Sequence, residues 1–289
     1  MKSYETQHTF HNFIAMLSKY YSQSLIVVME GHDDLFLLKE WVSSSVIVQH
    51  GEGGKGQILR VAERFVAEGN DRVRFVVDRD YDDYVEPPVV YSDNVVVSRY
   101  HDCFTDVLSV NQRLLARVVD YHLDSYRRSV DERARPASEV CVDSLVDRAF
   151  ELALMMAACR IVDLQSALSL NFKAFKFRKH ANEMLDASYI MRCLLRNAVC
   201  SDLDMDDLCA RAEKVVGELQ VLDFPLVGDH DLFAAVNYLV SRHGRSLSDK
   251  VIRSSLLTSI SVSVLRELIW CNVLEGWASS YRIGFFEES

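Results

Sequence analysis

Proline and glycine are scarce in this chain, with four prolines and eleven glycines among 289 residues. Both residues interrupt regular structure, so their scarcity favours long helices and strands over many short turns. Basic residues are also in the minority: 32 Lys and Arg stand against 42 Asp and Glu, a formal net charge of −10. This balance argues against a protein that coats nucleic acid non-specifically, because phosphate binding needs Lys and Arg. A local basic groove, or a partner that supplies one, remains compatible with it.

No two of the seven cysteines are spaced C-x-x-C, which argues against a zinc knuckle and favours buried free thiols in a reducing cytoplasm. Long apolar runs are missing too. The longest, LALMMAAC at 152–159, is too short to span a bilayer, and the N-terminal residues lack an apolar signal core. With 49% apolar and 26% charged residues, we expect a well-packed, soluble cytoplasmic protein that does not bind membranes.

The first 110 residues alternate between strand-like and helix-like segments. After a leading amphipathic helix at 8–21, strands are predicted at 25–31, 45–51, 73–80 and 95–102, and helices at 33–41 and 57–69. Strands that alternate with helices are typical of a parallel sheet with crossover helices.

From about residue 110 onward the pattern is helical. Helical periodicity covers 142–168, 181–199, 206–220, 231–243 and 248–278. We therefore predict an α/β fold: a mostly parallel sheet with crossover helices, followed by a mostly α-helical C-terminal half. The predicted domains are 1–109 and 110–289. An exposed apolar helix face would support a homodimer, although the pattern does not locate one.

Two apolar strands run directly into carboxylates. VVMEGHDD (27–34) places Glu30 and Asp34 after the first strand, and VVDRDYDDY (76–84) places Asp78-x-Asp80 after the third. Parallel strands end at the same edge of a sheet, so these side chains are expected to converge. Crowded carboxylates repel one another, and a divalent cation such as Mg²⁺ relieves that repulsion through hard oxygen ligands. Such a site can activate water and stabilise charge on a phosphate.

Three other motifs fit less well. A calcium loop that begins at Asp78 would need Gly and Glu where the chain has Asp83 and Val89. A P-loop in GEGGKG would need Ser or Thr after Lys55 and Gly at 49, where the chain has Gly56 and Gln49. Haloacid-dehalogenase-like phosphatases carry Asp-x-Asp after the first strand, whereas here it follows the third.

Glu-Gly after the first strand and Asp-x-Asp after the third resemble the Toprim domain, which topoisomerases, bacterial primases, recombination mediators and overcoming-lysogenisation-defect nucleases share. The resemblance covers residues 22–110. It implies acid–base work or metal binding for Glu30, and Mg²⁺ (or Mn²⁺) binding for Asp78 and Asp80. In the nuclease branch a further Asp follows the Glu in the early helix, and Asp34 is the matching position.

A closer resemblance rests on VVMEGHDDLFLLKEW, GGKG, RFVVDRDYDD and a late GDHDLF (228–233). Together they are similar to small Toprim effectors that pair with an ATPase in anti-phage defence, such as those of the phage anti-restriction-induced system (PARIS). The resemblance implies an effector that an ATPase subunit holds and releases as a nuclease, with host transfer RNA as a substrate. Related effectors often carry Glu just after the fourth strand, where this chain offers Asp102 as a candidate metal ligand. Lys55 is a candidate for neutralising the acidic site or contacting phosphate; otherwise it is a solvated loop lysine.

A basic segment, NFKAFKFRKHAN (171–182), interleaves three phenylalanines with Lys173, Lys176, Arg178 and Lys179. Aromatic and cationic side chains in this pattern suit single-stranded or looped RNA. Alternatively, the phenylalanines are core residues and the lysines extend to water.

His230 and Asp231 in GDHDLF are candidates to reach the metal site from the helical half; otherwise they form an ordinary helix start.

The leading hypothesis is a Mg²⁺-dependent endonuclease that hydrolyses phosphodiesters, with RNA favoured over DNA on the resemblance alone. The alternative is a non-catalytic Toprim-like subunit that docks on an ATPase, for which the acidic surface would suit a basic partner face. A primase or topoisomerase fragment fits less well, because neither a zinc cysteine set nor a strand-passage domain is evident.

Overall fold

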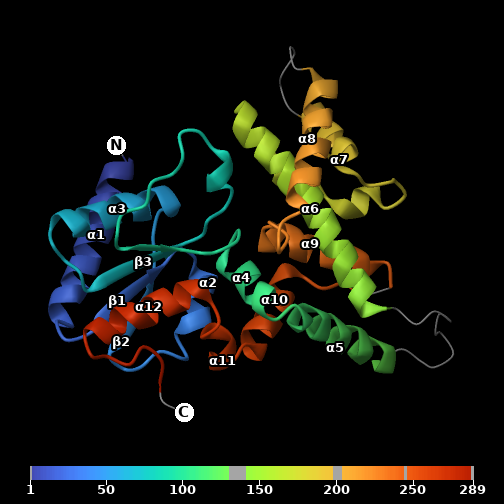
Figure 1. Cartoon of the computed structure of the whole chain (residues 1–289). Helices are drawn as coiled ribbons and strands as arrows, with labels where there is room; N and C mark the ends of the chain where they lie inside the picture. The colour runs from blue at the N-terminus through green and yellow to red at the C-terminus, as the bar shows by residue number, and fades with distance from the viewer. Residues whose placement is uncertain (1, 130–140, 198–203, 244–245, 288–289) are drawn as a thin grey trace. The chain divides into compact units, whose positions relative to one another are not determined.

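The computed structural model describes residues 2–129, 141–197, 204–243 and 246–287. The chain forms two compact units (Figure 1). Unit 1 contains Met1–Asp80, Val89–Val110 and Ile260–Ser289, and unit 2 contains Tyr81–Pro88 and Asn111–Ser259.

A four-stranded parallel sheet forms the centre of unit 1. Its strands are β1 (Leu25–Met29), β2 (Val46–His50), β3 (Val73–Val77) and β4 (Val95–Val97), in the spatial order β2-β1-β3-β4. All five residues of β1 are buried, as expected for an apolar run covered on both faces. Because β1 and β3 are neighbours at the centre of the sheet, the segments that follow them lie at the same edge.

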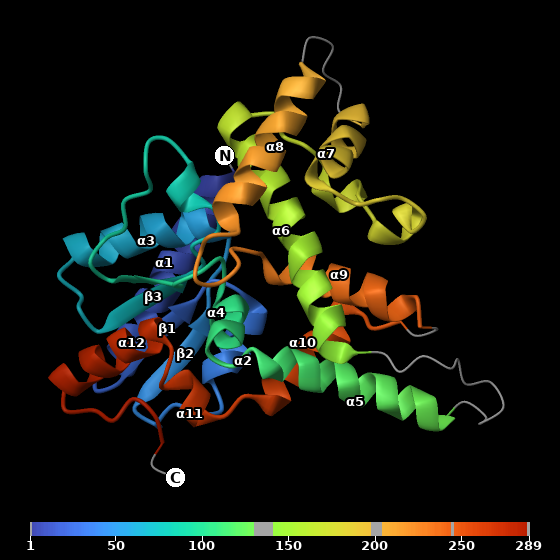
Figure 2. The ribbon, with the colours of Figure 1, turned by 45° about the vertical axis from the view of Figure 1, so that its right-hand side comes forward.

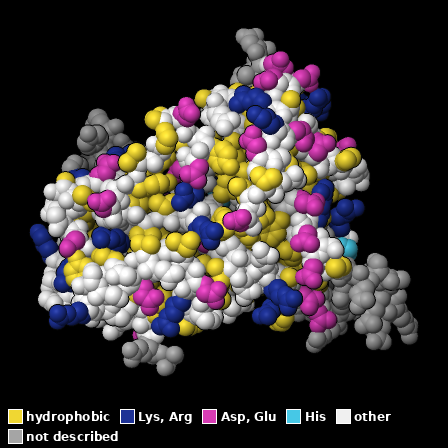
Figure 3. Space-filling model, in the orientation of Figure 1, with side chains coloured by type: hydrophobic (Ala, Val, Ile, Leu, Met, Phe, Trp, Pro, Cys, Tyr) yellow, Lys and Arg dark blue, Asp and Glu magenta, His cyan; other side chains and the backbone are white. Residues whose placement is uncertain are grey.

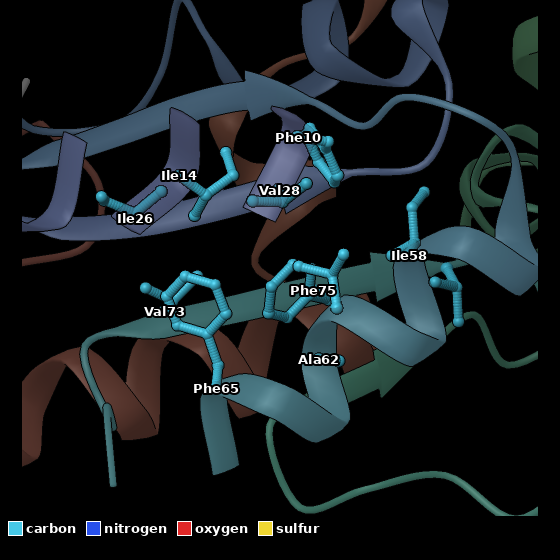
Figure 4. Packing of buried hydrophobic residues seen from close by; sticks show 11 residues of the cluster. Phe10, Ile14, Ile26, Val28, Ile58, Ala62, Phe65, Val73 and Phe75 are labelled. Atoms are coloured by element: carbon cyan, nitrogen blue, oxygen red, sulfur yellow. The ribbon is translucent and has the colours of Figure 1, made fainter. Parts of the chain in front are cut away.

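Two helices cover one face of this sheet. Helix α1 (Lys2–Tyr20) precedes β1, and α3 (Lys55–Ala67) connects β2 to β3. Phe10 of α1, Phe65 of α3 and Phe75 of β3 meet in the core (Figure 4), where the rings of Phe65 and Phe75 pack edge to face at 5.7 Å. Helix α2 (His32–Leu38) connects β1 to β2, and α4 (Cys103–Val110) follows β4.

The C-terminal segment returns to unit 1 through α11 (Val262–Leu265) and α12 (Ile269–Ser280). The indole N–H of Trp277 donates a hydrogen bond to the carbonyl of Asp71 at 3.0 Å, and the guanidinium of Arg74 lies 5.0 Å from the Trp277 ring. Arg74 and Phe75 are consecutive in β3 and point to opposite faces, so α12 covers the face that α1 and α3 leave open. The predicted domains were 1–109 and 110–289. In the structure Val110 and Asn111 belong to different units, but Tyr81–Pro88 belongs to unit 2 and Ile260–Ser289 to unit 1.

Unit 2 is built from helices around α6 (Val142–Ser166), which packs against α7 (Ala187–Arg196), α8 (Met205–Leu219) and α9 (Asp229–Ser241) (Figure 2). Ala149, Ala153 and Ala157 are fully buried on one side of α6, and small side chains at this spacing let neighbouring helices approach closely. Helix α5 (Arg113–Ser129) packs against α6 and against α10 (Asp249–Ser259). Short 3₁₀ helices lie at η1 (Asp82–Tyr84), η3 (Phe172–Ala174) and η4 (Phe177–His180).

This architecture confirms the predicted fold class, a parallel α/β sheet followed by a mostly helical half, and is consistent with a Toprim-like sheet. One predicted element was wrong: 248–278 is not a single helix but α10, α11 and α12. Hydroxyl side chains near the end of α10 turn back onto its backbone, as Ser259 does to the carbonyl of Ser255 at 2.7 Å, and such bonds favour a helix end. Among the described residues, no helix combines the length and hydrophobicity that crossing a membrane requires.

Candidate functional site

The first acidic group follows β1. The backbone N–H of Glu30 continues the sheet by donating to the carbonyl of Val76 at 3.0 Å. Asp34 is buried in the first turn of α2, and its Oδ2 accepts a hydrogen bond from the backbone N–H of Gly31 at 3.0 Å. A Cβ atom at Gly31 would lie 2.5 Å from that oxygen, so glycine is what allows Asp34 to fold back over the end of β1.

The second acidic group follows β3 and meets the first. Oε2 of Glu30 accepts a hydrogen bond from the backbone N–H of Asp78 at 3.1 Å, and Oδ1 of Asp78 accepts one from the backbone N–H of Cys103 at 3.1 Å. Asp78 thus links the ends of β1 and β3 to the start of α4. Burial, with Asp78 as the next contribution, raises the pKa of the Cys103 thiol well above its ordinary value, so this thiol stays protonated and is a poor nucleophile.

Lys55 and Asp80 form an ion pair beside Asp78. Nζ of Lys55, the first residue of α3, lies 3.0 Å from Oδ2 of Asp80 and donates to the carbonyl of Arg79 at 3.1 Å. The Lys55 side chain is 15% exposed and that of Asp80 is 46% exposed, so the ammonium is held inside while the carboxylate still faces water. Asp80 has a left-handed backbone with φ of 53°, and its N–H donates to the carbonyl of His101 at 2.8 Å.

Asp102 caps the start of α4. Its Oδ1 accepts a hydrogen bond from the backbone N–H of Thr105 at 2.7 Å, and its own N–H donates to the Thr105 hydroxyl at 3.0 Å. Oδ2 of Asp102 lies 3.0 Å from Nδ1 of His101. Asp102 therefore combines the capping role with a place in the acidic cluster.

Asp106 is a site residue that sequence reasoning missed. Its two carboxylate oxygens accept hydrogen bonds from the backbone N–H groups of Arg99 and Tyr100, both at 2.7 Å, and so hold the loop between β4 and α4. Burial raises the pKa of Asp106 to about 6, against the lowering effect of those two bonds. The available signal was the pattern Asp102-x-x-Thr105-Asp106, which places a second acid just inside a capped helix.

The cluster is electrostatically strained around Asp78. Burial raises the pKa of the Asp78 carboxyl well above its ordinary value, and four nearby carboxylates raise it further: Asp34, Asp102, Glu30 and Asp80. Four carboxylates from the segments that follow β1, β3 and β4 therefore act on Asp78, and a cation would relieve this repulsion.

The donor set suits Mg²⁺ or Mn²⁺, because carboxylate oxygens are the ligands that hard divalent cations prefer. The side chains nevertheless adopt conformations that bond to the protein itself. In the part of the chain that the structure describes, no three His, Cys, Asp or Glu side chains are arranged to hold a metal ion. A metal would therefore require these carboxylates to reorient from their backbone and Lys55 partners.

The other predicted residues lie in unit 2. Asp231 forms a bidentate ion pair with Arg160, with atoms 2.6 and 3.0 Å apart, and His230 lies 3.9 Å from Asp249. Both candidates therefore have partners within their own unit.

The cationic and the aromatic side chains of the basic segment (171–182) differ in their exposure. Lys173, Lys176, Arg178 and Lys179 are exposed, whereas Phe172, Phe175 and Phe177 are buried. The phenylalanines are therefore core residues, which is the second of the two interpretations given for this segment.

Comparison with models of known protein families, with curated proteins and with solved structures finds no match to this chain.

Proposed function

We propose that this chain is a metal-dependent nuclease with a Toprim-like sheet, which hydrolyses phosphodiester bonds in RNA. The observation that carries the proposal is the convergence of Glu30, Asp34, Asp78, Asp80 and Asp102 at the carboxyl edge of one parallel sheet. Burial, and then repulsion by the other four carboxylates, raises the pKa of Asp78 there. Open α/β sheets bind ligands at the carboxyl ends of their strands, and this acidic cluster lies at those ends. Carboxylates that only cap helices at the surface would not need to converge from the segments that follow three different strands.

In this proposal Glu30, Asp78, Asp80 and Asp102 hold Mg²⁺ or Mn²⁺. When bound, the ion supplies an activated water and a positive charge beside the phosphate. Glu30 is suited to accept a proton from the attacking water, because its carboxylate is already anchored by the N–H of Asp78. Asp34, held by Gly31, keeps the local field negative. Lys55 fixes Asp80 through Nζ and offers an ammonium for a phosphate oxygen.

The biological setting is proposed on the resemblance to effectors of the PARIS type. The chain would act in the cytoplasm as the toxic effector of an anti-phage system. An ATPase subunit would restrain it, and host transfer RNA would be the leading substrate. Nothing in the chemistry of the carboxylate cluster selects RNA over DNA, so the assay of this proposal must contain both.

The test is cleavage of mixed transfer RNA and DNA by the purified chain with Mg²⁺ or Mn²⁺, with and without EDTA. Glu30→Ala is expected to abolish the EDTA-sensitive cleavage while the circular dichroism spectrum and melting temperature remain close to wild type. Glu63→Ala, at an exposed position of α3 in the same unit, is the matched control and should cleave normally. Metal-dependent cleavage that persists in the Glu30 variant would refute the assignment.

One observation favours a second candidate, a non-catalytic subunit that docks on an ATPase. Within the described residues no metal-binding arrangement is formed, and each carboxylate of the cluster is bonded to the protein. The same assay separates the two candidates. Stable co-purification with an ATPase, together with no cleavage under any metal condition, would favour docking.

A further inference from the structure

Unit 2 contains a cavity of about 770 Å³ beside the basic segment. Its walls come from α6, from the 3₁₀ helices η3 and η4, from α9 and from the start of α10. This volume lies within the range of small-molecule sites, which is roughly 300–1,000 Å³. All of the lining residues belong to unit 2, whereas the residues of the carboxylate cluster belong to unit 1.

Among the charged side chains of the lining, cations outnumber acids. Five Lys and Arg residues line the cavity against two Asp residues, in a chain whose net charge is −10. Both Asp residues are already engaged, Asp231 by Arg160 and Asp249 by His230. The interaction with the Asp249 carboxylate is the main cause that raises the pKa of His230, which favours its charged form. The acids of this cavity therefore do not neutralise its lysines.

Three lysine ammonium groups on the cavity have no ion-pair or hydrogen-bond partner among the residues that the structure describes: Lys173, Lys176 and Lys179. The neighbouring Arg178 is held in place, because its NH2 donates to Oδ1 of Asn237 and to the hydroxyl of Ser246, both at 2.9 Å. By contrast, Lys214 on α8 forms an ion pair, with its Nζ 3.6 Å from Oε1 of Glu218. Several lysines that line one cavity without ion-pair partners in the described part of the chain form a site for a ligand with several negative charges.

The aromatic residues of this segment offer little for stacking a base. The ring of Phe175 is stacked on that of His180 at 4.8 Å, and Phe177 is stacked on Tyr238 at 5.8 Å. These faces are occupied within the protein, so recognition would depend on phosphate charge and not on base stacking. On the face that Figure 3 shows, acidic and basic side chains are interspersed.

We propose that this cavity binds the phosphate groups of a nucleotide, presented either by a free nucleotide or by an RNA strand. The proposal goes beyond the nuclease function and does not depend on it. Binding is therefore to be measured in EDTA, where metal-dependent cleavage cannot occur.

The experiment uses the full-length chain in about 50 mM salt, because phosphate binding weakens steeply as salt rises. One arm titrates ATP and inorganic triphosphate by calorimetry. The other arm titrates a short labelled oligouridylate by fluorescence anisotropy. The variant is Lys176→Glu, an exposed position on the cavity. The matched control is Lys214→Glu, an equal change of charge on α8 outside the cavity.

Binding of either probe that falls about tenfold or more in Lys176→Glu and less than about twofold in Lys214→Glu supports the proposal. The arm in which this occurs identifies the source of the phosphate. If no probe binds, or if both variants weaken binding equally, the cavity is not a phosphate site and the proposal is overturned. Failure of Glu30→Ala to abolish cleavage would leave this result unaffected, so the two proposals fail independently.

Discussion

The carboxylate of Glu30 accepts a hydrogen bond from the backbone N–H of Asp78, with 3.1 Å between the two atoms. These residues are 48 positions apart in the chain and each follows the end of a central strand. Because β1 and β3 pair in parallel from Ile26↔Val73 to Met29↔Val76, their carboxyl ends lie side by side. The bond therefore connects the two acidic motifs directly. It places Glu30, the proposed base, beside Asp78, a proposed metal ligand.

Asp78→Asn should stabilise the metal-free protein while removing metal-dependent cleavage. Burial and the surrounding carboxylates raise the folded-state pKa of Asp78, so its contribution to the free energy of unfolding falls as pH rises from its unfolded value of 3.8 through that raised pKa. The asparagine keeps an oxygen for the N–H of Cys103 but has no charge. In EDTA at about pH 8, we expect a melting temperature about 2–4 °C above wild type, and a smaller difference near about pH 4. A lower melting temperature than wild type at the higher pH would contradict this account.

Gly31→Ala should disturb the site through Asp34. The backbone at Gly31 has a φ of −98°, which alanine tolerates, so the effect comes from the 2.5 Å approach of the new Cβ to Oδ2 of Asp34. We expect cleavage to fall about tenfold or more, with a loss of about 1 kcal/mol in unfolding free energy by urea denaturation. Gly276→Ala is the control, because a Cβ there meets nothing within 4 Å. That variant should gain about 0.5–1 kcal/mol, as expected for glycine replaced in a helix.

Lys55→Gln should separate metal binding from turnover. Nζ of Lys55 neutralises Asp80 at 3.0 Å, so its removal makes the cluster more negative. We expect tighter Mg²⁺ binding by calorimetry, together with cleavage that is roughly tenfold or more slower, because a charge beside the phosphate is lost. Weaker Mg²⁺ binding with unchanged turnover would indicate that Lys55 only organises the loop.

Asp231→Ala should weaken unit 2 without affecting the carboxylate cluster. The aspartate is bound to Arg160 through two short contacts, and Arg160 lies over the ring of Phe172 at 4.4 Å. Removing the carboxylate strands a half-buried guanidinium, at a cost of about 2 kcal/mol in urea denaturation. Asp207→Ala, at an exposed position of α8, should cost far less. A fall in Mg²⁺ affinity in the Asp231 variant would contradict this expectation and would support Asp231 as a residue of the metal site.

The parallel sheet was predictable because strand and helix periodicities differ and alternate over the first 110 residues. The convergence of Glu30 with Asp78 followed from that alternation, since adjacent parallel strands end at one edge. The pattern Asp102-x-x-Thr105-Asp106 marks Asp106 as an acid just inside a capped helix. Its bonds to the backbone of Arg99 and Tyr100 were not predictable, because the path of that loop depends on β4 and α4. The return of α12 to the sheet was equally hidden, since an amphipathic helix does not specify which surface it covers.

The amino-acid sequence by itself determined most of the elements of this protein and the positions of the acidic residues that follow its strands, because apolar spacing and local charge are properties of short segments. Only the tertiary structure decided which carboxylate of one acidic motif bonds to the backbone of the other, and that the phenylalanines of 171–182 turn inward while three lysines line a cavity. Those outcomes depend on contacts between residues that are distant in the chain. Packing selects such contacts, and no local pattern encodes them.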